Sequence, residues 1–427
     1  MAIRPNILLI LADDHGYGDL SIHGGPALRT PRLDGLCSEG MRLTRCYANS
    51  SVCSPSRAAL MTGCFPDRVG VPGVIRTHAD DNWGYFRPDA ITLPQVLRAH
   101  GYRTLMSGKW HLGLEPENHP CRRGFDQFRG FLGDMMDDYL THRRHGINYM
   151  RSGEQEIDPA GHATDLFTDW AIAMIRAQAN SPDPFFCYLA YNAPHTPIQP
   201  PEEWIERARE REPNADDQRI RYVALVEHMD HGIGRVLDAL SATGAAGRTL
   251  VIYTSDNGGQ LDAGAWNGDL RGSKGDMYEG GIRVPACVRW PGEVPAGAVS
   301  EQVLLLSDLF RTLCEAAGAP FDHPIDGASL LPTFRGERQD LSGRLLYWLR
   351  REGGPEFAGL AQHAVRRGDL KLLHNCPFEP LQLFDLAADP LETTDLTSSN
   401  RASWRELQRD LQDAILQAGR VPWQRPT

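Results

Sequence analysis

Short apolar runs alternate along the chain with longer segments in which apolar residues recur at helical spacing. The run at 6–12 is rich in Ile and Leu, and a continuous run of this kind predicts a strand buried on both faces of a sheet. It ends at the polar pair Asp13 and Asp14. Similar segments predict further strands at 41–48, 104–106, 185–191 and 249–254.

Helices are predicted between these strands. Thr30 and Pro31 form an N-cap and first-turn pair, and Gly40 ends the helix that they begin. Ser307 and Asp308 begin another helix. The repeated alternation predicts an α/β fold, a large doubly wound sheet sandwiched by helices. Further helices are predicted at 93–100, 164–178 and 219–240.

The pattern changes after about residue 336. Short alternating segments then predict strands, and an amphipathic stretch at 404–416 predicts one helix. We therefore expect two domains, an α/β domain at 1–336 and a smaller domain at 337–427 in which one helix backs an antiparallel sheet. The strands of the smaller domain are predicted at 345–349, 362–366, 371–374 and 381–386.

Composition and charge restrict the classes of function. Hydrophobic residues make up 41% and charged residues 23% of the 427 residues, which excludes collagen-like, disordered and coiled-coil proteins. The 44 basic and 55 acidic residues give a net charge of −11, and this field repels nucleic acid and anionic membranes. We expect neither as a partner. An anionic substrate would need a local cluster of positive charge.

The sequence as it stands predicts a cytoplasmic protein. Its first apolar run is too short for a transmembrane helix and lacks the cleavage pattern of a signal peptide. The nine cysteines have no CxxC pairs and no zinc-type spacing, as is usual in a reducing compartment. If a signal peptide has been removed, a periplasmic or secreted location is expected instead. The sequence does not predict the oligomeric state.

Polar residues follow three of the predicted strands. Asp13 and Asp14 end the first strand, His195 follows a later one, and Asp256 and Asn257 follow the last. Because ligands of open α/β sheets bind at the carboxyl ends of the strands, we expect these segments to form one site. Carboxylate and amide oxygens suit calcium or magnesium and not zinc. The alternative is that the first aspartate pair only caps a turn.

Cys53 lies just before a predicted helix N-terminus. Pro55 suits the first turn of a helix that continues to Thr62, and Gly63 can end it. Free N–H groups and the helix dipole stabilise an anion at such an end, and Arg57 adds a permanent positive charge. We expect a cysteine there to shift toward the thiolate. The alternative is a buried structural cysteine beside an ordinary helix start.

These residues resemble the type I sulfatases of the alkaline phosphatase superfamily. The family's CxPxR signature is present at 53–57 as Cys-Ser-Pro-Ser-Arg, followed by Ala-Ala-Leu-Met-Thr-Gly. The chain looks most similar to arylsulfatases and N-acetylgalactosamine-sulfatases, and the resemblance implies an alkaline phosphatase-like fold with a mixed sheet. Lys274 also matches, as do the segments at 13–19, 108–113, 194–195, 255–258, 278–285, 383–386 and 389–390.

The resemblance implies a sulfuric ester hydrolase that works through a modified cysteine. A formylglycine-generating enzyme would convert Cys53 to formylglycine, whose hydrate attacks sulfur, carries a sulfate ester and releases inorganic sulfate. The implied substrate is a small anionic sulfate ester of an aryl or sugar alcohol, with exo action on sulfated carbohydrate. One divalent cation is also implied, typically Ca²⁺ with Mg²⁺ as the alternative, bound by Asp13, Asp14, residue 53, Asp256 and Asn257.

The resemblance also implies roles for five other side chains. Lys109 and Arg57 would stabilise residue 53 and the sulfate oxygens, and His111 is the family's candidate base for sulfate release. His195 and Lys274 would protonate the leaving oxygen and hold the sulfate. Fixed cations lower the barrier of such a transfer because charge accumulates on the oxygens. Considered singly, each lysine could be a surface charge and each histidine a loop residue.

Substrate contacts are predicted in the long loops. His78, Trp83 and Trp266 could stack on a sugar or aryl ring, and Arg143 or Arg144 could meet a uronate carboxylate, with solvated loop positions as the alternative. Two other functions fit the same sequence. A phosphonate or phosphodiester hydrolase of the superfamily would use the same residues, and a sulfoglycan-binding protein would retain an unmodified cysteine.

Overall fold

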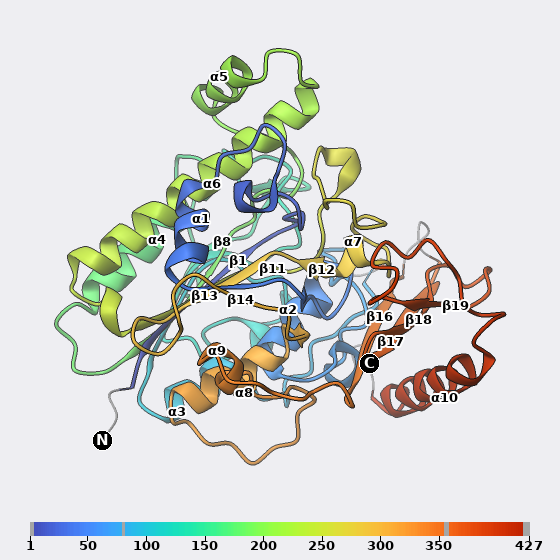
Figure 1. Ribbon diagram of the computed structural model, residues 1–427. Coiled ribbons are helices and arrows are strands. Elements are labelled where there is room, and N and C mark those ends of the chain that lie inside the picture. The colour runs from blue at the N-terminus through green and yellow to red at the C-terminus, as the bar shows by residue number, and fades with distance from the viewer. Residues whose placement is uncertain (1–3, 79–81, 354–357, 422–427) are drawn as a thin grey trace.

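The computed structural model of the protein describes residues 4–78, 82–353 and 358–421. Its central feature is a sheet of ten strands in the order β14-β2-β13-β11-β1-β10-β4-β5-β8-β9 (Figure 1). The strands in the middle run parallel to one another and supply the site described below. They are β11 (Thr249–Ser255), β1 (Asn6–Ala12), β10 (Phe185–Ala190), β4 (Arg103–Lys109) and β5 (Gln127–Phe131).

Shorter strands complete both edges of this sheet. β13 pairs antiparallel with β11, and β8 pairs antiparallel with β5, so the sheet is mixed. The predicted α/β fold class is confirmed, including the mixed sheet that the resemblance implies. The edge strands are β13 (Ala286–Arg289), β2 (Met41–Leu43), β14 (Ala298–Ser300), β8 (Met150–Ser152) and β9 (Gln155–Glu156).

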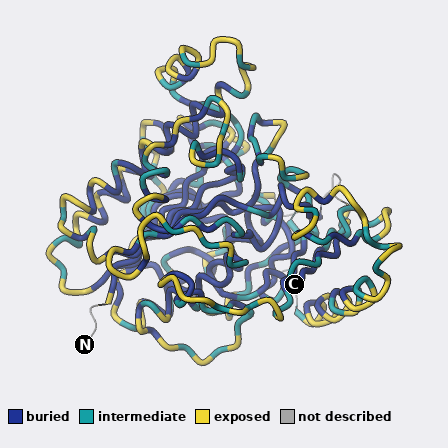
Figure 2. Tube along the Cα trace, in the orientation of Figure 1, coloured by how far each residue is buried: buried dark blue, intermediate teal, exposed yellow. Residues whose placement is uncertain are grey.

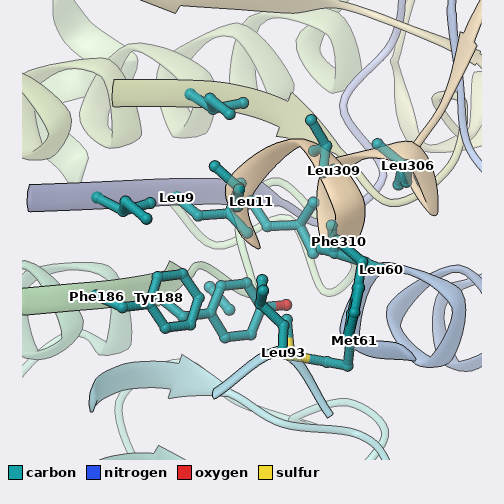
Figure 3. Packing of buried hydrophobic residues seen from close by; sticks show 14 of the residues in the cluster. Leu9, Leu11, Leu60, Met61, Leu93, Phe186, Tyr188, Leu306, Leu309 and Phe310 are labelled. Atoms are coloured by element: carbon teal, nitrogen blue, oxygen red, sulfur yellow. The ribbon is translucent and has the colours of Figure 1, made fainter. Parts of the chain in front are cut away.

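Side chains of β1 alternate between the two faces of the sheet, and each set packs under its own layer of helices. Leu9 and Leu11 share a core with Phe310 of the first layer (Figure 3). Leu8 and Ile10 belong to the core under the second layer. The first layer holds α2 (Cys53–Thr62), α3 (Leu93–Ala99), α8 (Asp308–Ala316) and α9 (Leu331–Phe334), and the second holds α1 (Pro31–Glu39), α4 (Ala163–Ala177) and α6 (Asp217–Ala242) (Figure 1).

The single strand predicted at 41–48 is wrong. The chain leaves the large sheet after β2 and forms β3 (Cys46–Tyr47), which pairs with β12 (Arg283–Val284) and β15 (Leu304–Leu305) in a separate sheet. Met41 packs in the core of the large sheet, whereas Tyr47 packs against the C-terminal part. One apolar run therefore contributes residues to two hydrophobic cores. Its hydrophobic pattern does not show that the strand is interrupted between β2 and β3.

The C-terminal residues form an antiparallel sheet covered by α10 (Arg401–Ala418), as predicted. Leu372 and Leu407 lie in the core that this sheet and helix share, and Met277 enters the same core from the α/β part. A domain boundary at residue 336 stays a prediction. The strands of this sheet are β16 (Leu345–Arg351), β17 (Ala361–Arg367), β18 (Leu370–His374) and β19 (Gln382–Asp385).

Exposure increases outward from the large sheet. Strands β1, β10 and β11 are buried throughout, whereas α5 (Glu202–Arg211) projects from the molecule and exposes most of its length (Figure 2). The remaining short elements are α7 (Glu279–Ile282) and a hairpin of β6 (Arg143–Arg144) and β7 (Ile147–Asn148). Within the described part of the chain, no helix combines the length and the apolar character that crossing a membrane requires.

Candidate active site

The carboxyl ends of four parallel strands meet at one buried cluster of polar side chains. Asp13 and Asp14 follow β1, Lys109 ends β4, His195 follows β10 and Asp256 follows β11. All five are buried. Because β1 lies between β10 and β11, the ends of these strands are adjacent. The sheet topology therefore brings together residues that are far apart in the sequence.

Helix α2 places Cys53 in this cluster. The helix begins at Cys53 and ends where Gly63, with a φ of +70°, adopts the left-handed conformation. Sγ of Cys53 lies 3.2 Å from Oδ1 of Asp13. Burial and the carboxylates of Asp13 and Asp256 raise the pKa of the Cys53 thiol well above its ordinary value. The predicted shift toward the thiolate is therefore wrong, because burial and negative neighbours outweigh the helix N-terminus.

The carboxylates of the cluster compete for positive charge. Burial alone would raise the pKa of Asp13, but Lys109 and Arg57 hold it well below its ordinary value. Burial and the negative charge of Asp13 raise the pKa of Asp256 to about 7, despite the opposing effect of Arg57. Buried carboxylates that disfavour one another's ionisation would be relieved by a divalent cation. The charge balance of the cluster therefore fits a metal site.

Asn257 gives a second reason to expect a cation. Its Nδ2 donates to Oδ1 of Asp14 at 2.8 Å, whereas its own Oδ1 is buried and has no hydrogen-bond partner among the described residues. A buried hydrogen-bond acceptor without a partner lowers the stability of the folded protein, and a hard cation bound to that oxygen would offset this loss. The thiol of Cys53 is too soft for such an ion. Oxygen ligands for Ca²⁺ or Mg²⁺ are available from Asp13, Asp14, Asp256 and Asn257.

Two buried cations face the same carboxylates. Nε of Arg57 donates to Oδ2 of Asp256 at 2.8 Å, and Nη1 donates to the carbonyl of Lys109 at 3.1 Å. Nζ of Lys109 donates to Oδ2 of Asp13 at 2.5 Å. Both side chains are fully buried, so water screens their charges little. Fixed positive charges of this kind stabilise negative charge that develops nearby.

Lys274 and His195 form a hydrogen-bonded pair at the edge of the cluster. Nζ of Lys274 lies 3.1 Å from Nε2 of His195 and donates to Oδ2 of Asp14 at 2.7 Å. Nδ1 of His195 bonds to the carbonyl of Thr196 at 2.7 Å, and because a carbonyl only accepts, Nδ1 carries the proton. Burial and Lys274 lower the pKa of His195. The imidazole is therefore neutral, with Nε2 as an acceptor.

His111 is a neutral base with one nitrogen available. Its Nε2 lies 3.0 Å from the carbonyl of Ile75 and must donate to it, which leaves Nδ1 unprotonated. Nδ1 is buried and has no partner among the described residues. Burial, Lys109 and Arg57 lower the pKa of His111 well below its ordinary value. The φ of +59° at His111 is unusual for a residue with a side chain, and such strain is typical of functional sites.

A cavity of about 670 Å³ opens onto this cluster. Cys53, His111, His195 and Lys274 contribute to its wall from the α/β part of the molecule. The wall also contains residues that sequence reasoning missed, because they come from segments without any recognisable motif. These are Arg76, Asp134, Gln260, Asp262, Arg350 and Glu352, among others.

The five predicted substrate-contact residues do not appear in the wall of this cavity. Arg143, in the β6–β7 hairpin, pairs at 2.7 Å with the exposed Asp158. Arg144 donates to Asp134 at 3.0 Å, and since Asp134 lines the cavity, Arg144 lies behind the wall. Both arginines therefore form ion pairs with nearby carboxylates.

The three aromatic candidates are also held by neighbouring residues. The ring of His78 packs on that of His145, with centroids 4.4 Å apart. The guanidinium carbon of Arg351 lies 5.5 Å from the ring centroid of Trp83. Trp266 packs so closely on Gly18 that a Cβ there would lie 2.5 Å from its ring. Their predicted role in substrate binding stays a prediction without support from the cavity wall.

The fold and the buried cluster define an alkaline phosphatase-like hydrolase. A family model described as Sulfatase matches residues 5–319, and a model described as N-sulphoglucosamine sulphohydrolase, C-terminal, matches residues 273–420. The chain therefore belongs to the sulfatase family and is a sulfuric ester hydrolase. The resemblance stated from the sequence is confirmed.

Curated relatives and a solved structure support this assignment. The chain is 36% identical over 365 residues to N-acetylgalactosamine-6-sulfatase of Sus scrofa, covering 80% of this chain and 67% of the relative. It is 32% identical over 459 residues to arylsulfatase J of Mus musculus, covering 96% and 75%. The crystal structure of Ps i-CgsB in complex with k-i-k-neocarrahexaose superposes with a TM-score of 0.88 at 31% identity, covering 96% of this chain and 92% of that one.

Proposed function

We propose that the protein releases inorganic sulfate from a sulfated sugar by S–O cleavage, after Cys53 has been converted to formylglycine. The observation that carries the proposal is the burial of Cys53 at the start of α2, 3.2 Å from Oδ1 of Asp13. When present, the modified residue would supply an oxygen nucleophile, and a divalent cation, with Ca²⁺ as the first expectation, would favour its ionised form. Asp13, Asp14, Asp256 and Asn257 would hold that cation.

The other buried residues have separate tasks in this proposal. Arg57 and Lys109 stabilise the charge that develops on the sulfuryl oxygens, because both are fixed and shielded from water. Nδ1 of His111 accepts a proton when sulfate leaves residue 53. Lys274 and His195 hold the proton that the leaving oxygen needs. The lowered pKa of His111 keeps its nitrogen available as a base near neutral pH.

The names of relatives support a sugar as the substrate. One relative is an N-acetylgalactosamine-6-sulfatase, and a structural neighbour contains a neocarrahexaose. The cavity of about 670 Å³ is larger than a sulfate group requires and has walls from both the α/β part and the C-terminal sheet. A pocket closed on two sides suits the end of a saccharide chain, which supports exo action.

The test begins with the peptide 46–57, released by cleavage after Arg45 and Arg57. Protein made together with a formylglycine-generating enzyme is expected to show formylglycine or its hydrate at residue 53 by mass spectrometry. The same protein should have a higher kcat/KM on 4-nitrophenyl sulfate than on bis(4-nitrophenyl) phosphate. An unmodified cysteine under these conditions, or a clear preference for the diester, would overturn the proposal. Cys53→Ala is the inactive control.

A further inference from the structure

Two arginines and one glutamate form a cluster in the wall of the cavity that contains Cys53. Nη2 of Arg76 donates to Oε2 of Glu352 at 2.5 Å, and Nε of Arg350 donates to Oε1 at 2.6 Å. The side chain of Glu352 is 2% exposed, whereas those of Arg76 and Arg350 are 27% and 17% exposed. One buried carboxylate thus orients two arginines that remain accessible from the cavity.

The cluster is fixed relative to the catalytic groups. Arg76 follows Ile75, whose carbonyl accepts the hydrogen bond of His111 at 3.0 Å. Nη1 of Arg350 donates at 3.0 Å to the carbonyl of Gly275, which follows Lys274. Each arginine is therefore tied within one residue to a side chain that the proposed reaction uses. A ligand group bound by the cluster would be placed at a defined distance from residue 53.

The cavity wall contains charged side chains of both signs. Arg76, Arg350 and Glu352 together carry one net positive charge. Among the described residues of the wall, the other charged side chains are Lys274, Asp134 and Asp262. The arginines and Lys274 thus bring basic side chains next to the reaction centre in a chain whose net charge is −11.

We propose that Arg76 and Arg350 bind a second anionic group of the substrate, a carboxylate or a second sulfate on the sugar that carries or adjoins the scissile ester. This proposal rests on the sulfatase function proposed above and extends it to polyanionic saccharides. A planar guanidinium with several N–H groups matches the paired oxygens of a carboxylate or sulfate. Glu352 is a positioning residue, because its buried carboxylate accepts hydrogen bonds from both arginines.

Binding can be measured by calorimetry in the Cys53→Ala background, so that no ligand is consumed. Three disaccharides share an N-acetylgalactosamine 6-sulfate unit: one with a free uronate, one with its methyl ester, and one with the methyl ester and a second sulfate. Because hydrogen bonds between charged groups are stronger than those between neutral groups, the doubly anionic ligands should bind at least about tenfold more tightly than the ester. Comparing the free uronate with the second sulfate identifies the preferred anion.

Arg76→Gln and Arg350→Gln should each remove most of this preference, whereas Arg350→Lys should keep part of it because the charge remains. Arg143→Gln, outside the cavity and paired with Asp158, is the matched control. Equal affinities for the three ligands, or a preference that survives in both glutamine variants, would overturn the proposal. Melting temperatures of all variants reveal any loss of folding, and Arg350→Lys keeps the test valid if a glutamine variant unfolds.

The same proteins separate this proposal from the proposed function. With Cys53 restored and converted, the wild-type protein and the control Arg143→Gln should hydrolyse 4-nitrophenyl sulfate with similar kcat/KM, because Arg143 is not part of the cavity wall. A wild-type protein that carries formylglycine but hydrolyses no sulfate ester would refute the function while leaving the binding preference measurable. Normal turnover without any preference would refute the second anion site alone.

Discussion

Nζ of Lys274 lies 3.1 Å from Nε2 of His195, and this nitrogen is the one that the bond from Nδ1 to the Thr196 carbonyl leaves unprotonated. Lys274 therefore donates and His195 accepts. A proton that reaches the leaving oxygen through His195 must be supplied by Lys274 or by solvent. The two residues are expected to act as one proton-donating unit and not as two independent cations.

Replacing either residue should slow the cleavage of poor leaving groups most. His195→Ala and Lys274→Ala are each expected to reduce kcat/KM for alkyl-like sulfates by roughly 10²–10⁴-fold, as for the loss of a general acid. Esters of acidic phenols should lose less, because their leaving oxygens need no proton. The measurement is the dependence of kcat/KM on the pKa of the phenol in a series of aryl sulfates.

The double variant provides the control for this prediction. If the residues act as a unit, the combined loss should be close to that of the more damaging single change. Multiplicative losses, or equal losses for every leaving group, would contradict the shared role. The variant Arg143→Gln changes a residue of the β6–β7 hairpin that pairs with the exposed Asp158, and it should leave the dependence unchanged.

Two parts of the candidate site could be placed from the sequence: the polar residues at strand ends and the local motif around Cys53. The run at 6–12 becomes β1, with polar residues directly after it, and the segment from Cys53 becomes α2. The break within 41–48 was not predictable, because the same apolar pattern fits one strand or two. Glu352 and Arg76 are 276 positions apart in the sequence, and a hydrogen bond of 2.5 Å joins their side chains. Neither residue lies in a motif. The ion pair of Arg143 with Asp158 was not predictable either, because it depends on side-chain orientation.

Calcium should stabilise the wild-type protein in a concentration-dependent manner. A ligand that binds only the folded state adds RT ln(1 + [L]/Kd), about 2.7 kcal/mol at one hundred times Kd. Asn257→Leu should reduce the gain, because it removes the buried oxygen that has no partner among the described residues. The measurement is the melting temperature against Ca²⁺ concentration, with Mg²⁺ in parallel and a chelator to reverse the shift. An identical shift in the variant would argue against this ligand.

Stability should fall as the pH decreases from about 6.5 toward 4, in part because of His162. Burial and the neighbouring His228 lower the pKa of His162 to about 4, whereas an unfolded histidine titrates near 6.5. Between these values the unfolded state binds more protons, so each such histidine adds a slope of about 1.4 kcal/mol per pH unit. Above pH 6.5 both states are neutral and the contribution is constant.

His162→Asn isolates this contribution. Nδ1 of His162 accepts a bond from the backbone N–H of Thr164 at the start of α4, and asparagine is a good N-cap residue that does not titrate. The free energy of unfolding, measured in urea between pH 5 and 6, should therefore change less steeply with pH in the variant, by the equivalent of about one bound proton. An unchanged slope in the variant would assign the acid sensitivity to other groups.

The contact between the α/β part and the C-terminal sheet should depend on Lys371. Its Nζ donates to Oε1 of Glu279 at 3.0 Å and to Oε1 of Glu392 at 2.8 Å, and all three side chains are buried. Lys371→Met keeps the length of the side chain but leaves two carboxylates without their shared cation. Breaking a buried ion pair in this way typically costs about 3–5 kcal/mol, so the melting temperature should fall markedly.

A triple variant that combines Lys371→Met with Glu279→Gln and Glu392→Gln is the control. It should recover much of the lost stability, since no unpaired charge then remains. If the triple variant is no more stable than Lys371→Met, the loss arises from packing and not from charge.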